Sequence, residues 1–126
     1  MQKLDVAIID YKISNMFSVK SACEFFGLHV DVVNGREQIL NARAAILPGV
    51  GTFSAGMYHL KELQLEEVIF EFIASGKPFM GICLGMQLLM SDSEEFGYHK
   101  GLDIIQGSVK KLPQMNDKSE KIRIPN

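Results

Sequence analysis

Short apolar runs alternate along this chain with segments of helical periodicity. Four runs have the length and composition of strands that are buried on both faces of a sheet. They cover residues 6–9, 29–33, 44–47 and 79–82. Helical segments between strands require crossover connections, and these join parallel strands. The predicted fold is therefore α/β: a parallel sheet, with mixed pairing at its edge, that carries helices on both faces.

Helical periodicity is strongest in residues 65–73. There apolar side chains follow the spacing i, i+3, i+4, i+7 and i+8, and Gly76 and Pro78 mark the end of the helix. A shorter helix is predicted for residues 84–90, directly after the fourth run, and weaker strand patterns follow around residues 104–112. A helix after the first run ends before Gly27 and carries four apolar residues on one face: Val19, Ala22, Cys23 and Phe26.

Length, charge and cysteine content limit the classes of function. The 126 residues suffice for one ordinary domain, and the formal net charge of −2 argues against a broad basic surface for nucleic acid. Two cysteines do not make a disulfide framework, and Cys23 is expected to pack in the core. No apolar run approaches the roughly 20 residues that span a bilayer, and no signal-peptide pattern is present. We expect a cytoplasmic protein that binds neither nucleic acid nor membrane.

The most specific motif is Gly81-Ile82-Cys83-Leu84-Gly85, which follows a predicted strand and precedes a predicted helix. Its form, G-x-nucleophile-x-G, is that of a nucleophile elbow. In such a tight turn a side chain at either glycine would clash with nearby backbone. The turn exposes the thiol at the start of a helix, where N–H groups favour the thiolate. Cys83 is therefore a candidate nucleophile and the Leu84 N–H a candidate oxyanion donor; the alternative is that Cys83 is a small buried packing residue.

A glycine-rich loop, residues 48–53, directly follows the third apolar run. Its glycines free the backbone to turn N–H groups toward a ligand. The loop is interpreted as an oxyanion loop facing the elbow, as a nucleotide-binding loop, or as an ordinary strand–helix turn. The dinucleotide fingerprint needs a glycine where Ser54 stands, and the chain lacks the Gly-Lys-Ser/Thr of a Walker A loop. Pairing with the elbow favours the oxyanion loop.

Functional residues of a parallel sheet belong at the carboxyl ends of its strands. This rule singles out residues 10–15, residues 48–53 and the elbow. A cysteine nucleophile usually needs a histidine base. His29 is predicted at the wrong end of a strand, His59 on a helix face and His99 in a loop, so a surface or packing role is preferred for each. None has a partner at metal-ligand spacing, and no metal site is predicted.

Together these motifs resemble the class I (triad-type) glutamine amidotransferases, most closely the glutaminase subunit of imidazole glycerol phosphate synthase. The elbow alone is shared by many amidotransferases, but the combination is specific and spans essentially the whole chain. The segments that carry the resemblance are Asp10-Tyr11 with Asn15, Leu47-Pro48-Gly49-Val50-Gly51, Ser75-Gly76-Lys77-Pro78 and Gly81-Ile82-Cys83-Leu84-Gly85-Met86-Gln87.

The resemblance implies an activity, a partner and a set of site residues. Glutamine is hydrolysed to glutamate and ammonia through a thioester, without a cofactor or a metal ion. The ammonia passes to a (β/α)-barrel synthase subunit, the heterodimer partner, in histidine biosynthesis. By position, the implied residues are Cys83 as nucleophile, Val50 and Leu84 as backbone oxyanion donors, Gly49, Gly51 and Gln87 as substrate-binding residues, and Glu95 as the carboxylate that holds the glutamine α-amino group.

Two residues depart from the pattern of the family. Lys12 and Ser14 stand where the family usually has glycine, in a loop that faces the partner subunit. A subunit of a sugar-amidating enzyme from a surface-polysaccharide pathway is therefore an alternative. Another is a truncated, non-catalytic binding module. A third is a different cysteine-elbow enzyme, against which Gln87 and Glu95 argue.

The catalytic histidine and glutamate of the family lie near the C-terminus of its domain, and no residue here matches either one. We therefore expect residues 1–126 to be the N-terminal portion of a single amidotransferase domain. The chain alone is expected to be inactive, because an unassisted cysteine cannot protonate the leaving ammonia. An exposed apolar surface at the edge of the sheet and reduced stability are further expectations.

Overall fold

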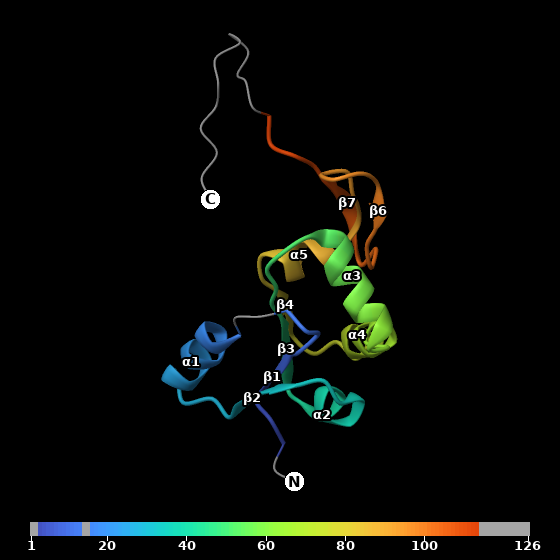
Figure 1. The fold of residues 1–126 in the computed structure, drawn as a ribbon. Coiled ribbons are helices and arrows are strands. Elements are labelled where there is room, and N and C mark those ends of the chain that lie inside the picture. The colour runs from blue at the N-terminus through green and yellow to red at the C-terminus, as the bar shows by residue number, and fades with distance from the viewer. Residues whose placement is uncertain (1–2, 14–15, 114–126) are drawn as a thin grey trace.

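A four-stranded parallel sheet forms the centre of the molecule in the computed structural model, which describes residues 3–13 and 16–113 (Figure 1). The strand order is β2-β1-β3-β4, and every neighbouring pair is parallel. The four predicted runs are confirmed to within one residue at each end. The strands are β1 (Val6–Ile9), β2 (Val30–Val33), β3 (Ala44–Leu47) and β4 (Phe79–Gly81). Ser14 and Asn15 lie outside the described residues.

The described residues contain more helix than the sequence predicts. The helices are α1 (Phe17–Phe25), α2 (Arg36–Asn41), α3 (Phe53–Glu62), α4 (Glu66–Ala74) and α5 (Leu84–Leu88). Neither α2 nor α3 was assigned by periodicity: α2 has six residues and buries only Ile39, and the buried face of α3 includes Gly56. Helix α5 is shorter than predicted, since Met90 already begins another strand.

Helices cover both faces of the sheet, as predicted. Alternate residues of β1 point to opposite sides, as the pleat requires. Ala7 and Ile9 join the core under α2, α3 and α4, whereas Val6 and Ile8 join a smaller cluster under α1 (Figure 1). The core on the first face thus includes residues of α2, α3, α4 and α5, whereas the cluster on the second face, within the described residues, includes those of α1.

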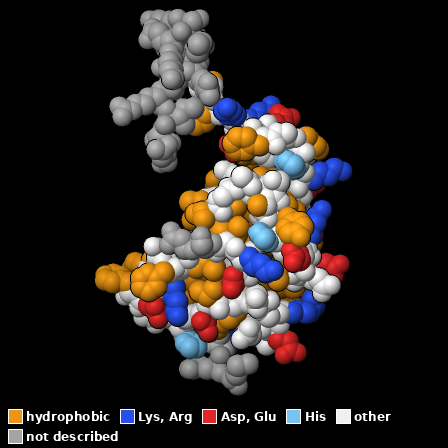
Figure 2. Space-filling view, in the orientation of Figure 1, with side chains coloured by type: hydrophobic (Ala, Val, Ile, Leu, Met, Phe, Trp, Pro, Cys, Tyr) orange, Lys and Arg blue, Asp and Glu red, His pale blue; other side chains and the backbone are white. Residues whose placement is uncertain are grey.

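The apolar face predicted for α1 is only half right. Val19 and Cys23 pack against the smaller cluster, which confirms the packing role of Cys23. Phe26 is 77% exposed and Ala22 is exposed, because only a narrow side of α1 meets the sheet and the helix contains no fully buried residue. Figure 2 shows hydrophobic side chains gathered on the surface over α1.

Strand β4 forms one edge of the main sheet in the described part of the chain, and β2 forms the other. Met80, at its centre, is 57% exposed, and Ile46 on the neighbouring strand is half-buried. The predicted exposed apolar surface at the sheet edge is confirmed.

A second, smaller sheet follows α5. It contains β5 (Met90–Ser93), β6 (His99–Lys100) and β7 (Ile105–Val109) in the order β6-β5-β7. Its pairing is mixed, with β6 antiparallel and β7 parallel to β5, so mixed pairing occurs in this separate sheet and the main sheet stays parallel. The prediction of a loop around His99 was wrong, since a two-residue strand has no periodicity to detect. No helix in the described part of the chain is long and apolar enough to span a membrane.

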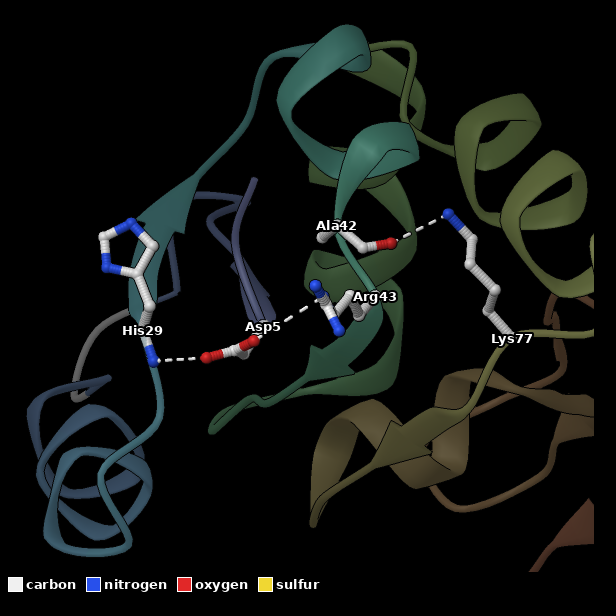
Figure 3. A network of polar contacts seen from close by, with 5 residues as sticks. All are labelled: Asp5, His29, Ala42, Arg43 and Lys77. Atoms are coloured by element: carbon white, nitrogen blue, oxygen red, sulfur yellow. Dashed lines mark hydrogen bonds and ion pairs between the residues drawn. The ribbon is translucent and has the colours of Figure 1, made fainter. Parts of the chain in front are cut away.

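Polar side chains tie the amino ends of the main strands together (Figure 3). Asp5, before β1, accepts a hydrogen bond from the His29 N–H at 2.8 Å, and its other carboxylate oxygen lies 3.7 Å from the Arg43 Nε. Lys77, before β4, donates to the Ala42 carbonyl at 2.8 Å. His29 thus lies at the predicted end of its strand, and the edge opposite the elbow is braced by side chains.

Candidate active site

The loops that follow β1, β3 and β4 meet at the carboxyl edge of the sheet. The parallel register aligns Ile8 with Ile46 and Leu47 with Gly81, so these three strands end side by side. Two of the three loops are the glycine-rich loop and the elbow. The predicted site residues of both loops therefore lie in one region, at the edge of the sheet where the sequence rule placed them.

The elbow between β4 and α5 has the conformation that its motif predicts. Cys83 has φ 54° and ψ −121°, a left-handed backbone that side chains rarely adopt. The residue is exposed and its thiol is free. The alternative that Cys83 is a small buried packing residue is therefore wrong, and the turn presents the thiol to solvent.

Both flanking glycines are sterically required. A Cβ at Gly85 would overlap the carbonyl oxygen of Leu47 and lie 2.6 Å from its carbon, and one at Gly81 would lie 2.7 Å from the Met86 Cα. These neighbours are backbone atoms, which cannot rotate away as a flexible side chain can. The predicted clash at each flank is confirmed, and the close approach explains why the thiol projects from the turn.

The glycine-rich loop lies against the elbow. A Cβ at Gly49 would overlap the Tyr11 hydroxyl and lie 3.1 Å from the Leu84 Cβ. Gly51 has φ 109°, which favours glycine, and Val50 between the two is 47% exposed. Thr52 then caps α3, because its Oγ1 accepts the Ala55 N–H at 3.3 Å.

The two N–H groups implied as oxyanion donors point in different directions. The Leu84 N–H donates to the Gly49 carbonyl at 3.2 Å. In a trans peptide the C=O and N–H are antiparallel, so the Val50 N–H of the same peptide points away from Leu84. In this conformation the Leu84 N–H already has a protein acceptor.

Tyr11 is a contact of the site that the sequence analysis did not assign. Its side chain is fully buried, and its hydroxyl donates to the Pro48 carbonyl at the start of the glycine-rich loop. Burial raises the pKa of the Tyr11 phenol well above its usual range, because the charged form is desolvated. The phenol therefore remains a hydrogen-bond donor. The sequence did place Tyr11 within residues 10–15, at the carboxyl end of β1, which is where functional residues of a parallel sheet are expected.

Gln87 and Glu95 are placed differently with respect to the elbow. The Gln87 N–H donates to the Cys83 carbonyl at 3.2 Å, so Gln87 lies one helical turn from the nucleophile, as its spacing predicts. Glu95 follows β5 and is half-buried, and its N–H binds the Ser93 hydroxyl at 3.3 Å. One hydrogen bond thus joins Leu84 to Gly49 and another joins Gln87 to Cys83, which precedes Leu84 in the chain. Glu95 lies in the neighbouring sheet region, and no hydrogen bond among the described residues joins it to these four.

The described residues join no histidine ring to Cys83 by a hydrogen bond. His59 lies half-buried on α3, and the His99 Nε2 lies 3.1 Å from the Phe96 carbonyl oxygen. Within residues 3–13 and 16–113, no group of three or more potential metal ligands occurs. This part of the chain places an exposed cysteine next to the Leu84 N–H and the glycine-rich loop.

Known proteins are similar to this chain in sequence. Residues 7–125 match the family model described as glutamine amidotransferase class-I. The chain is 45% identical over 121 residues to imidazole glycerol phosphate synthase subunit HisH 1 of Legionella pneumophila (strain Paris), covering 96% of this chain and 57% of that protein. It is 40% identical over 122 residues to the HisH subunit of Geobacter sulfurreducens, with 96% and 58% covered. The chain thus spans little more than half the length of these relatives.

A solved structure supports the same fold. A crystal structure described as a glutamine amidotransferase superposes with a TM-score of 0.71 at 19% identity, covering 84% of this chain and 56% of the other.

Proposed function

The chain belongs to the class-I glutamine amidotransferase family, and from this premise we propose that it carries the nucleophile of a glutaminase that supplies ammonia to a synthase. The observation that carries the proposal is the exposed Cys83 on a strained strand–helix turn. The similarity to HisH subunits favours imidazole glycerol phosphate synthase, and hence histidine biosynthesis, as the destination of the ammonia. A (β/α)-barrel synthase subunit in a cytoplasmic heterodimer is the proposed partner.

The proposed reaction begins with attack of the Cys83 sulfur on the side-chain amide carbon of glutamine. The C–N bond then breaks, ammonia leaves with an added proton, and a glutamyl thioester remains. Water hydrolyses this thioester to glutamate and restores the thiol. A general acid and base must move these protons, and no residue here matches the family's histidine and glutamate. Residues 1–126 are accordingly proposed to be the N-terminal portion of the domain and to turn over glutamine very slowly on their own.

The proposed oxyanion hole requires a local rearrangement. The Leu84 N–H must exchange the Gly49 carbonyl for the oxyanion of the tetrahedral intermediate. Rotation of the Gly49–Val50 peptide would remove that carbonyl and turn the Val50 N–H toward the elbow in the same motion. The rotation changes ψ of Gly49 and φ of Val50, and Gly49 carries no Cβ that restricts the first of these angles.

Substrate binding is proposed to involve Gln87 and Glu95 together with the backbone of Gly49 and Gly51. Glu95 is half-buried, and its carboxylate suits the α-ammonium group of glutamine. Gln87 lies one turn beyond Cys83 and offers an amide to the bound amino acid.

The test is covalent capture, which needs the nucleophile and the substrate site but no complete turnover. The chain is incubated with a glutamine analogue that carries a chloromethyl ketone in place of the side-chain amide, and the adduct is located by mass spectrometry. We expect labelling at Cys83 that excess glutamine suppresses and that Cys83→Ala abolishes. Cys23→Ala is the matched control and should retain full labelling.

Two results would count against the proposal. Equal modification of Cys23 and Cys83, insensitive to glutamine, would indicate unspecific alkylation. The absence of any adduct, in a folded chain that still bound a synthase subunit, would favour the non-catalytic binding module.

A further inference from the structure

We propose that Tyr11 is a positioning residue for the oxyanion loop, residues 48–51: its hydroxyl fixes the Pro48 carbonyl and thereby holds Gly49 against the elbow. The position of this loop follows from the structure itself. Its chemical consequence, faster formation of an oxyanion at Cys83, rests on the proposed glutaminase function.

The contacts of Tyr11 connect two loops at the carboxyl edge of the sheet. The residue follows β1, and its fully buried ring belongs to the main hydrophobic core. Its hydroxyl donates to the Pro48 carbonyl, and a Cβ at Gly49 would overlap the same hydroxyl. The Pro48 oxygen would also lie 3.1 Å from a Cβ at Gly85. The Pro48 carbonyl is therefore enclosed between Tyr11 and the elbow.

A buried carbonyl needs a hydrogen-bond donor, and Tyr11 provides one. Proline has no N–H, so Pro48 itself donates no backbone bond that could anchor the start of the loop. Since burial keeps the Tyr11 phenol protonated, the donor persists across the ordinary pH range.

The anchored peptide is the one directly before the peptide that must rotate. Tyr11 holds the Pro48–Gly49 peptide, whereas the Gly49–Val50 peptide carries the carbonyl now bound by the Leu84 N–H. With the first peptide fixed, the Gly49 Cα acts as a pivot, and rotation of the second peptide delivers the Val50 N–H to a defined place. Without the anchor the whole loop can shift, and a misplaced donor stabilises an oxyanion poorly.

The experiment compares Tyr11→Phe with the unaltered chain, using two electrophiles. The glutamine chloromethyl ketone passes through an oxyanion at Cys83, whereas iodoacetamide alkylates the thiol without one. We expect Tyr11→Phe to slow labelling by the ketone roughly tenfold and to leave the iodoacetamide rate unchanged. A purely structural loss would change both rates and the fraction of folded protein. Tyr58→Phe, on an exposed ring of α3, is the matched control.

A second measurement does not depend on the proposed function. Amide hydrogen exchange reports the bond from the Leu84 N–H to the Gly49 carbonyl, which exists only while the loop stays in place. We expect roughly tenfold faster exchange at Leu84 in Tyr11→Phe, with unchanged exchange in α4. Where the unaltered chain forms no ketone adduct, the proposed function fails and this exchange rate alone decides the role of Tyr11.

A double variant tests the contact from the opposite side. Gly49→Ala should displace the loop, because the new methyl group would overlap the Tyr11 hydroxyl. Removing that hydroxyl makes room, so Tyr11→Phe should restore part of the Leu84 protection that Gly49→Ala loses. Independent, additive effects of the two substitutions, or a ketone rate in Tyr11→Phe that is unchanged or faster together with unchanged exchange at Leu84, would overturn the proposal.

Discussion

The two edges of the parallel sheet are held by different parts of the chain. At the amino edge, charged side chains reach across from one strand to the next (Figure 3). At the carboxyl edge, backbone approaches backbone, and glycines leave the room for it. At the amino edge, which we call the side-chain edge, neighbouring side chains can adjust when one contact is removed. At the carboxyl edge, which we call the backbone edge, an added side-chain atom meets backbone and can be admitted only if a strand or a helix moves. The candidate site lies at the carboxyl edge, where glycines let strands and helices approach closely.

Left-handed backbone conformations occur in all three loops at the carboxyl edge. The loops after β1, β3 and β4 contain Lys12 at φ 67°, Gly51 at φ 109° and Cys83 at φ 54°. Lys12 stands where the resembling family usually has glycine, and its left-handed backbone shows the physical reason for that preference. Strain of this kind persists only where the surroundings over-determine the conformation. Each of the three loops around the candidate site therefore contains a residue with a left-handed backbone.

The largest expected effect is at Gly85, where an added methyl group meets the Leu47 carbonyl. Gly85→Ala should lower the free energy of unfolding by about 3 kcal/mol or more, because α5 must separate from β3 to admit it. Against a typical stability of about 5–15 kcal/mol, such a loss is a large fraction of the free energy of unfolding. Urea denaturation followed by circular dichroism measures it.

Gly35→Ala is the matched control for that substitution. A Cβ at Gly35 would approach only the end of the flexible Gln38 side chain, at 2.9 Å from its Oε1. We expect a change well below that of Gly85→Ala. Equal losses in the two variants would mean that the backbone edge is no less tolerant than the rest of the molecule.

The next effect probes the side-chain edge through Lys77. Its ammonium donates to the Leu40 and Ala42 carbonyls at 2.6 and 2.8 Å and lies 4.5 Å from the centroid of the Phe72 ring. Lys77→Met keeps much of the aliphatic chain but removes these bonds, so we expect a loss of about 1–2 kcal/mol in the free energy of unfolding. The rate of Cys83 labelling should stay unchanged in the folded fraction.

Lys61→Met is the control, because Lys61 is an exposed lysine of α3. Its stability should stay within about 0.5 kcal/mol of the unaltered chain. A Lys77→Met variant that slowed labelling as well would show that the two edges are coupled through β4.

The difference between the edges also explains what the sequence could reveal. The elbow, the glycine-rich loop and the four strands were predictable, since close backbone approach requires glycine and a buried strand requires a continuous apolar run. Both requirements leave local patterns. The amino-edge contacts were not predictable, because the partners of Asp5 and Lys77 lie 24 to 38 residues away and a charged residue in a sequence does not indicate its partner.

Other omissions have the same physical origin. Helix α3 was not predicted because Gly56 interrupts its apolar face. The structure gives the reason for the glycine: a Cβ at this position would lie only 3.0 Å from the Leu88 side chain. Tyr11 was noticed only as part of a motif, because the acceptor of its hydroxyl is a backbone carbonyl, which no residue type identifies. The orientation of the Leu84 N–H is likewise a matter of peptide rotation that composition and spacing do not determine.

The smallest expected effect has the opposite sign and tests the strain at Cys83. A non-glycine residue with a left-handed backbone lowers the free energy of unfolding by about 1–3 kcal/mol. Replacement by glycine removes this strain but costs about 0.5–1 kcal/mol, because glycine loses more backbone entropy on folding. Cys83→Gly should therefore raise the free energy of unfolding by about 1 kcal/mol while it removes the thiol. Cys83→Ala removes the thiol and keeps the strain, so its stability should match that of the unaltered chain. Urea midpoints of the three chains separate these cases. Equal midpoints for the glycine and alanine variants would mean that the turn holds Cys83 without strain, and the carboxyl edge would then differ from the amino edge in packing alone.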